Sequence, residues 1–271
     1  MHRPRPADGA EPSAPPVSGA SVVQAAADLS AIGGYFSLQV GGPAGDGWRP
    51  LAGLLTAPAA LEEMITGVAA RLGTGQMRVA ASVCFQGLAA RLWSPALAAA
   101  AVHDLLIDLD PERVYWRAAS GGPLPLCVPR PAGRRLGGHA PAGGPLYDAV
   151  VAALLEPLIG TVRQVVRIAP GLLRGNAASA LAGAADVLAR RRPAAAAATA
   201  ALARDLLDRG LLRGTGEVTG PASGRLAFVR RSCCLYYRLP GGGMCGDCAL
   251  SGSAARRARR ARAVNGPRAE R

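Results

Sequence analysis

The spacing of apolar residues predicts helices over most of the chain. Residues 58–73, "PAALEEMITGVAARLG", repeat apolar positions at helical intervals, begin with a proline and end at a glycine. Residues 77–93 continue the same period, and "SPALAAAAVHDLLIDL" (94–109) reads as a separate helix with Ser94 as N-cap and Pro95 as its first residue. Further helices are expected around 21–31, at 146–168 with a bend near Pro157, at 176–191 and at 193–210.

Short extended segments interrupt this helical pattern. "RVYWRA" (113–118) and "LPLCVP" (124–129) are typical of strands joined by a glycine turn, and 130–145 is a loop rich in glycine and proline. Residues 225–240, "RLAFVRRSCCLYYRLP", also read as extended. The expected fold class is therefore mainly α (α+β): a helical body with a few short strands and a C-terminal cysteine loop.

Changes in composition divide the chain into four parts. We expect a disordered proline-rich tail at 1–20, a helical body at 21–225, a cysteine-containing segment at 226–250 and a disordered arginine-rich tail at 251–271.

The formal net charge of +13 raises the question of nucleic-acid binding. The last 21 residues hold seven Arg and one Glu, so nearly half of the excess lies in the C-terminal tail. A tail of this kind is usually solvated, and nucleic acid is not an expected partner. The sequence shows no apolar leader and no uninterrupted apolar run long enough to span a membrane. We therefore expect a cytoplasmic protein, and peripheral contact with the inner face of the membrane stays open.

Four of the six cysteines lie close together, as Cys233, Cys234, Cys245 and Cys248. A disulfide cluster is disfavoured, because thiols stay reduced in the cytoplasm and a chain of this length needs no covalent staples. The spacing C-C-x10-C-x2-C contains one chelating CxxC pair, but neighbouring residues of a strand point to opposite faces, which makes one tetrahedral zinc awkward. A binuclear 2Fe–2S cluster is wider, so the geometry tilts toward the cluster and leaves zinc open.

This spacing at the C-terminus, after a helical body, resembles the FhuF-like ferric siderophore reductases, of the actinobacterial type. Two body segments are also similar to members of that family: "GLAARLWSPALAAAAV" and "LLRGNAASALAGA". The resemblance extends over roughly residues 60–250 and is strongest at the cysteines.

The resemblance implies that all four cysteines bind one 2Fe–2S cluster and that no catalytic residue is needed beyond it. The implied activity is a one-electron reduction of a ferric, hydroxamate-type siderophore that releases Fe(II). No nucleotide-binding motif is present, so an external electron donor such as a ferredoxin or flavodoxin is expected. Two alternatives stay open: a zinc-stabilised four-cysteine binding module with a basic tail, and an iron–sulfur carrier or sensor that does not act on siderophores.

Five further residues are candidates for function. Arg230 and Arg231 flank the cysteines and could attract an acidic donor protein. Asn176, Ser179 and Trp93 lie in the two segments that resemble the family and are candidates to face the siderophore, although Asn176 is also a good helix N-cap and Trp93 a good core residue. The other two cysteines, Cys84 and Cys127, stand in apolar surroundings and are expected to be buried and inert.

Overall fold

The structure is a computed structural model, and it describes residues 15–43, 45–119, 121–137, 142–219 and 226–251. It confirms a mainly helical α+β chain with short strands. The helices are α1 (Gly19–Ser30), α2 (Ala52–Thr56), α3 (Pro58–Arg71), α4 (Met77–His103), α5 (Gly143–Tyr147), the π-helix η1 (Asp148–Leu155), α6 (Glu156–Val165), α7 (Pro170–Arg191), α8 (Ala196–Leu207) and the 3-10 turns η2 (Pro193–Ala195), η3 (Gly210–Leu212) and η4 (Tyr236–Arg238).

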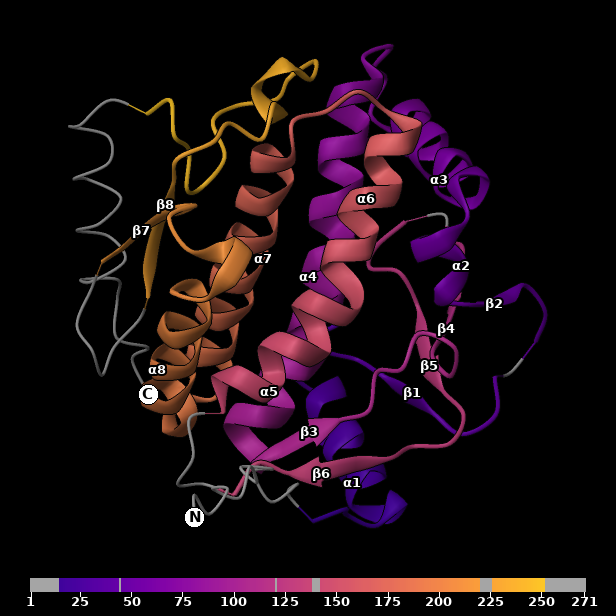
Figure 1. The fold of residues 1–271 in the computed structure, drawn as a ribbon, viewed down its shortest axis with the longest axis vertical. Helices are drawn as coiled ribbons and strands as arrows, with labels where there is room; N and C mark the ends of the chain where they lie inside the picture. Colours follow the sequence, from indigo (N-terminus) through magenta and orange to yellow (C-terminus); the bar gives the residue numbers. More distant parts are fainter. Residues whose placement is uncertain (1–14, 44, 120, 138–141, 220–225, 252–271) are drawn as a thin grey trace, which may run out of the picture.

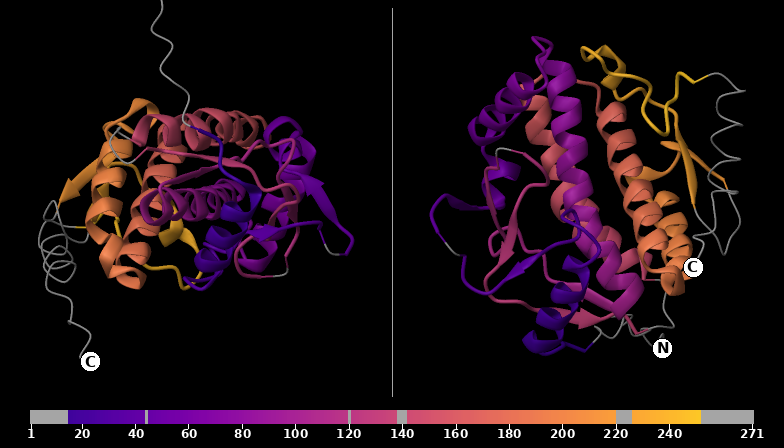
Figure 2. Two further views of the ribbon diagram at one scale, coloured as in Figure 1. Left: turned by 90° about the horizontal axis from the view of Figure 1, so that it is seen from below. Right: turned by 180° about the vertical axis from the view of Figure 1, so that it is seen from behind.

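Helix α4 runs through the middle of the molecule, and the other long helices pack around it (Figure 1). Helix α7 lies along one side of α4 and α8 covers α7, while α3 packs on the other side of α4 and α6 contacts both α3 and α7, an arrangement that Figure 2 shows from two more directions. Both α4 and α7 are rich in alanine, and α4 is buried over most of its length. Small side chains let the two backbones approach closely, and a helix that is apolar on all sides belongs in a core.

The strands form three small sheets at the edges of this helical layer. They are β1 (Gln39–Val40), β2 (Trp48–Pro50), β3 (Leu105–Ile107), β4 (Tyr115–Arg117), β5 (Leu126–Val128), β6 (Gly133–Arg135), β7 (Gly216–Thr219) and β8 (Ala227–Arg230). The first sheet has the order β1-β5-β4-β2, with β1 parallel to β5 and the other pairs antiparallel; β3 pairs with β6, and β7 with β8. The predicted strands at 113–118 and 124–129 are confirmed as β4 and β5, whereas residues 225–240 are extended only in β8.

The predicted break at Ser94 and Pro95 is wrong, because α4 continues through both residues to His103. The Ser94 hydroxyl donates to the Ala90 carbonyl at 2.7 Å, one turn back, instead of capping a new helix. Pro95 costs the helix one hydrogen bond, but its ring is buried in the core. The helix ends earlier than predicted, where Asp104 adopts a left-handed conformation and the chain enters strand β3.

Two predicted boundaries differ from the structure. Helix α1 begins at Gly19 and Pro16 forms a β-bridge with Arg134, so residues 15–20 belong to the fold and not to a tail. At the other end, β7 of the predicted body pairs with β8 of the predicted cysteine segment, which joins the two parts. The predicted tails at 1–14 and 252–271 lie outside the described residues.

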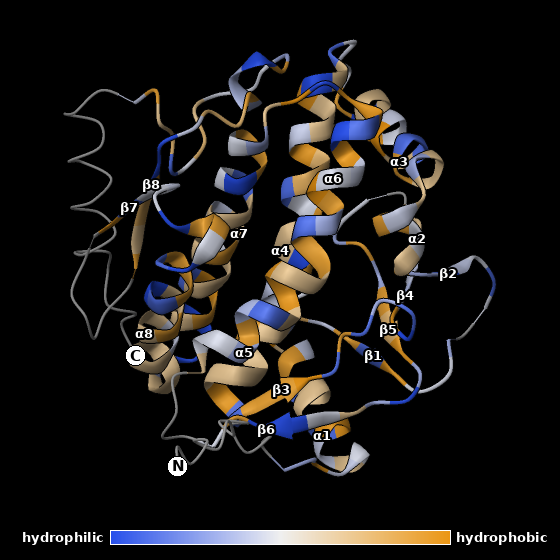
Figure 3. Ribbon diagram, viewed as in Figure 1, coloured by the Kyte–Doolittle hydropathy of each residue, from blue (hydrophilic) through white to orange (hydrophobic). Residues whose placement is uncertain are grey.

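One apolar stretch in the described residues, Gly143–Val165, has the length and composition of a membrane span, and half of it is buried inside the fold. It consists of α5, η1 and α6. Helix α6 begins at Glu156, beside the predicted bend near Pro157. Helix α6 packs against α2, α3 and α7. Figure 3 shows the hydropathy of the residues along this stretch and along α4.

Arg91 is a buried cation that ties α4 to the loops beside it. Only 3 % of Arg91 is exposed. Its guanidinium donates to the carbonyls of Leu124 at 2.6 Å, Tyr35 at 2.8 Å and Ser37. Burial lowers the pKa of Arg91 to about 10, which still leaves it charged at neutral pH. One side chain therefore satisfies three loop carbonyls that the fold removes from water.

We expect Arg91→Met to lower the free energy of unfolding by about 3 kcal/mol, because it leaves buried carbonyls without a donor. The matched control is Arg113→Met, whose parent side chain is 61 % exposed and should change stability by no more than about 0.5 kcal/mol. Urea unfolding followed by circular dichroism measures both. Equal stability of the two variants would contradict the role assigned to Arg91.

Candidate metal centre

The cysteine segment starts at the end of β8 and lies across the ends of α4 and α7 (Figure 1, yellow). Its approach to α7 depends on Gly175, where a Cβ atom would stand only 2.1 Å from the Ser232 hydroxyl. On α4, the Ser82 hydroxyl donates to the Cys234 carbonyl at 2.6 Å. The two central helices therefore fix the backbone on which the vicinal cysteines stand.

A buried arginine connects this segment to both helices. Only 1 % of Arg230 is exposed, and its Nε donates to Asp247 Oδ2 at 3.0 Å. Its Nη1 donates to Asn176 Oδ1 at 2.6 Å and its Nη2 to Gln86 Oε1 at 3.4 Å. Asn176 in turn donates to the Ser82 carbonyl and hydroxyl, both at 2.9 Å. We call Ser82, Gln86, Asn176, Arg230 and Asp247 the Arg230 network.

The chain turns sharply between the two cysteine pairs. Leu235 directly follows the vicinal pair and has a φ of 65°, a left-handed conformation that is uncommon for leucine. Gly242 closes the turn, because a Cβ there would stand 2.4 Å from the Tyr236 carbonyl oxygen. The vicinal pair is thus followed by a tight turn instead of the extended strand expected from the sequence, and the turn brings the CxxC pair back to it.

The turn places the sulfurs of Cys234 and Cys245 in hydrogen-bond contact. The bond from the Cys245 thiol lowers the pKa of Cys234 to about 6, with a smaller contribution from the charge of Arg230. The same bond raises the pKa of Cys245, because its proton is held between the two sulfurs. Cys234 and Cys245, which are eleven positions apart in sequence, therefore lie in direct contact.

Backbone N–H groups are directed at the cysteine sulfurs. The Leu235 amide donates to Cys233 Sγ at 3.4 Å, the Leu250 amide donates to Cys248 Sγ at 3.3 Å, and the Tyr236 amide donates to Cys234. Amide hydrogen bonds to sulfur stabilise thiolates and tune iron–sulfur centres. The donor set therefore fits a metal-bound thiolate cluster.

Within the described part of the chain, no three His, Cys, Asp or Glu side chains converge around one point. A structural zinc needs four ligands around a single point, whereas a binuclear cluster divides four thiolates between two irons.

The other two cysteines, Cys84 and Cys127, are buried outside the cysteine segment. Burial raises the pKa of Cys84 to about 12 and also raises the pKa of Cys127.

The structure corrects four of the expected roles. Asn176 lies inside α7 and is fully buried in the Arg230 network, so it neither caps a helix nor faces a ligand. Trp93 is a fully buried core residue, and Ser179, which is 8 % exposed, accepts a hydrogen bond from Gln86. Arg230 is buried and cannot meet a donor protein on the surface. Arg231 is exposed, as its expected docking role requires, and donates to the Gly214 carbonyl.

Three members of the Arg230 network were not singled out from the sequence. Ser82 and Gln86 are polar residues spaced i, i+4 in a mostly apolar helix, and this spacing places them on one face. Asp247 stands inside the CxxC motif itself. What the sequence does not contain is the pairing of these residues with Arg230.

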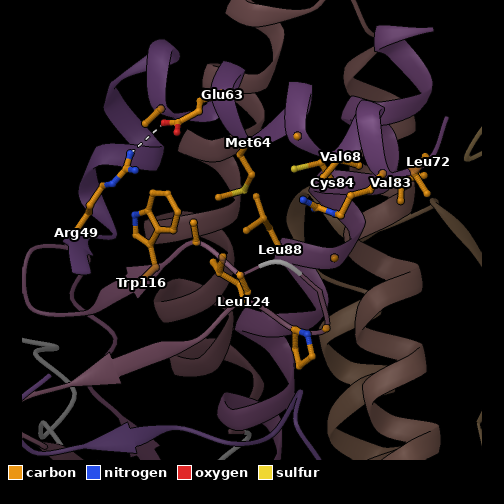
Figure 4. Close-up of a pocket in the computed structure, with 18 of the residues that line it drawn as sticks. Arg49, Glu63, Met64, Val68, Leu72, Val83, Cys84, Leu88, Trp116 and Leu124 are labelled. Atoms are coloured by element: carbon orange, nitrogen blue, oxygen red, sulfur yellow. Dashed lines mark hydrogen bonds and ion pairs between the residues drawn. The ribbon is translucent and has the colours of Figure 1, made fainter. Parts of the chain in front are cut away.

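A second feature is a cavity of about 500 Å³ on the opposite side of α4 (Figure 4). It lies between α3, α4, β4 and the loop that leads into β5, and its wall is mainly apolar. At one end, Arg49 pairs with Glu63 at 3.2 Å and lies over the Trp116 ring at 5.2 Å. No motif in the sequence marks this cavity, because its wall is assembled from five separate segments of the chain.

The comparisons with known proteins concern the cysteine segment. Residues 230–250 match the FhuF 2Fe-2S C-terminal domain, a range that begins at Arg230 and includes all four clustered cysteines. A search of curated proteins found no match to the chain. The matched domain is one that carries a 2Fe–2S cluster, in agreement with the thiol and amide geometry. Residues 230–250 are therefore similar to the FhuF 2Fe–2S C-terminal domain, and the cofactor of this segment is a 2Fe–2S cluster.

Proposed function

We propose that this protein is a ferric siderophore reductase, which reduces the iron of a hydroxamate-type chelate and releases it as Fe(II). The observation that carries the proposal is the FhuF-type segment at 230–250, fastened by a buried arginine to the core of the molecule. When bound, the 2Fe–2S cluster supplies a one-electron step, in which Fe(III) of the chelate becomes Fe(II) and an external donor later returns the electron. Ferrous iron is held far more loosely than ferric iron by hard oxygen ligands, so reduction is a release step.

The proposed ligands are Cys233, Cys234, Cys245 and Cys248. Their backbone amide partners and the contact between Cys234 and Cys245 support this assignment. The chain's contribution is to hold two cysteine pairs in register before a metal arrives. Ser82 and Gly175 do so from α4 and α7, respectively, by hydrogen bonding and by close approach.

Arg230 is proposed to set the charge around the cluster. A cluster held by four thiolates is anionic, and a buried cation beside it favours the reduced form and so raises the reduction potential. Asp247 partly offsets this charge at 3.0 Å. The network of neutral hydrogen-bond acceptors, Asn176 and Gln86, lets the arginine remain buried and charged.

The electron donor is proposed to dock on the exposed face of the same segment. Four of the large apolar residues that are exposed in the described chain lie there: Tyr236, Tyr237, Met244 and Leu250. Arg231 and Arg238 add two exposed positive charges, and the only acidic residue of 231–250, Asp247, is paired with Arg230. An apolar patch with a basic rim complements an acidic ferredoxin or flavodoxin. The reaction is proposed to take place in the cytoplasm, where such donors are reduced.

Replacing Cys245 with serine should abolish the cluster, because a ligand thiolate is lost. We expect the purified wild-type protein to be brown, with charge-transfer absorption that bleaches on reduction, and Cys245→Ser to be colourless. Cys84→Ser and Cys127→Ser are the matched controls and should keep the colour, since both thiols lie away from the segment. Absorption and EPR spectra under anaerobic conditions, with iron and zinc analysis, measure this; colour retained in Cys245→Ser would refute the ligand assignment, and a colourless zinc-containing wild type would refute the function.

Replacing Arg230 with glutamine should lower the midpoint potential of the cluster, because the buried positive charge is removed. It should also lower the free energy of unfolding by about 3 kcal/mol, since Asp247 loses its partner in a buried site. Arg230→Lys keeps the charge without the planar fork, so its potential should stay closer to that of the wild type while its stability falls.

The exposed neighbour supplies the control for this pair. Arg231→Gln should leave both the potential and the stability nearly unchanged. Redox titration followed by EPR gives the potentials, and urea unfolding gives the stabilities. If Arg230→Gln and Arg231→Gln had the same potential, the electrostatic role of Arg230 would be wrong.

A single-turnover experiment tests the reductase activity. The protein is reduced with dithionite, freed of excess reductant and mixed with ferrichrome, a neutral ferric trihydroxamate. We expect the cluster to be reoxidised while a ferrous chelator captures one Fe(II) per cluster. An iron–sulfur carrier or sensor without this activity would stay reduced under the same conditions. Stopped-flow absorbance of the cluster and of the ferrous chelate measures both halves of the reaction.

A further inference from the structure

The cavity beside α4 has the size and chemistry of a small-molecule site. Its volume of about 500 Å³ lies within the usual range for ligand pockets. Met64, Leu88 and Leu124 give it an apolar wall, and Trp116 presents an aromatic ring (Figure 4). More of its wall is apolar than polar, which favours a ligand with a substantial apolar outer surface.

The charges around the cavity limit the charge of that ligand. The lining contains Arg49, Arg71 and Glu63, a sum of one positive charge, and the first of these is already paired with Glu63. A trianionic tris-catecholate complex would need several more cations to be taken out of water. A neutral tris-hydroxamate complex presents hydrocarbon linkers and uncharged amide-like groups, which suit an apolar wall with one spare cation.

The cavity and the cysteine segment lie on two faces of the same turn of α4. Ser82 donates to the Cys234 carbonyl on one side, and the next two residues, Val83 and Cys84, line the cavity on the other. Gly87, one turn further along, also lines it. Only the width of a single helix, about 10 Å, therefore separates a ligand in the cavity from the proposed cluster ligands.

We propose that this cavity, between α3, α4, β4 and the loop into β5, is the binding site for the ferric hydroxamate chelate. The proposal rests on the proposed reductase function and adds the place of its substrate. It assigns opposite sides of α4 to the two partners, with the electron donor at the exposed cysteine segment and the chelate in the cavity.

The cavity can be filled without disturbing its walls. Gly87 stands in the interior of α4, and a Cβ atom added there would meet no atom within 4 Å. Gly87→Phe should therefore place a ring in the open space and improve the local helix propensity. The matched control is Gly183→Phe, at an exposed glycine in the interior of α7 whose Cβ would also meet no atom within 4 Å.

The experiment measures binding to the oxidised holoprotein by isothermal titration calorimetry, so that it does not depend on electron transfer. We expect ferrichrome to bind the wild type and Gly183→Phe equally, and to bind Gly87→Phe at least about tenfold more weakly, a difference of about 1.4 kcal/mol. The absorption spectrum, EPR signal and midpoint potential of Gly87→Phe should match those of the wild type, which shows that the cluster segment is intact. Ferric enterobactin, a trianionic tris-catecholate, should bind the wild type more weakly than ferrichrome.

Failure of this site and failure of the reductase function give different results. If Gly87→Phe binds ferrichrome as tightly as the wild type and is reoxidised by it at the same rate, the cavity is not the site, although the function stands. If reduced wild-type protein is not reoxidised by ferrichrome at all, the proposed function fails. Tighter binding of the tris-catecholate than of ferrichrome would overturn the assignment of the ligand class.

Discussion

The functional end of this protein depends on one buried charge. Arg230 has 1 % of its surface exposed and holds together three parts of the chain that are far apart in sequence: Asp247 in the CxxC motif, Asn176 in α7 and Gln86 in α4. A buried guanidinium is stable only when its donors are occupied. The same contacts that satisfy it therefore fix the cysteine loop, a segment with little regular structure of its own, onto the rigid helical layer.

This anchoring explains why the body of the molecule is built from small residues. The alanines and glycines of α4 and α7 let the two helices pack closely, and Gly175 leaves the space that Ser232 occupies just before the vicinal cysteines. Ser82 then reaches the Cys234 carbonyl directly. A Cβ atom at position 175 would meet the Ser232 hydroxyl at 2.1 Å, so a larger residue there would displace that side chain.

The cysteine segment and the cavity lie on opposite faces of α4. The cysteine segment presents exposed aromatic and apolar side chains with a basic rim to one side. The cavity under α3 opens on the other side, with a loop wall that Arg91 holds in place through the carbonyls of Tyr35 and Leu124. A single central helix thus contacts the cysteine segment on one side and the cavity on the other.

The sequence by itself determined the local features: the helical periods, the strands at 113–118 and 124–129, and the C-C-x10-C-x2-C spacing, which predicted the cluster through its resemblance to the FhuF-like family. These depend on interactions between near neighbours, or on the ligand chemistry of cysteine. Only the tertiary structure decided that α4 continues through Pro95, that Asn176 and Arg230 are buried partners, and where the cavity lies. Those outcomes depend on which helix faces meet, and contacts between residues as distant as Gln86 and Arg230 leave no periodic trace along the chain.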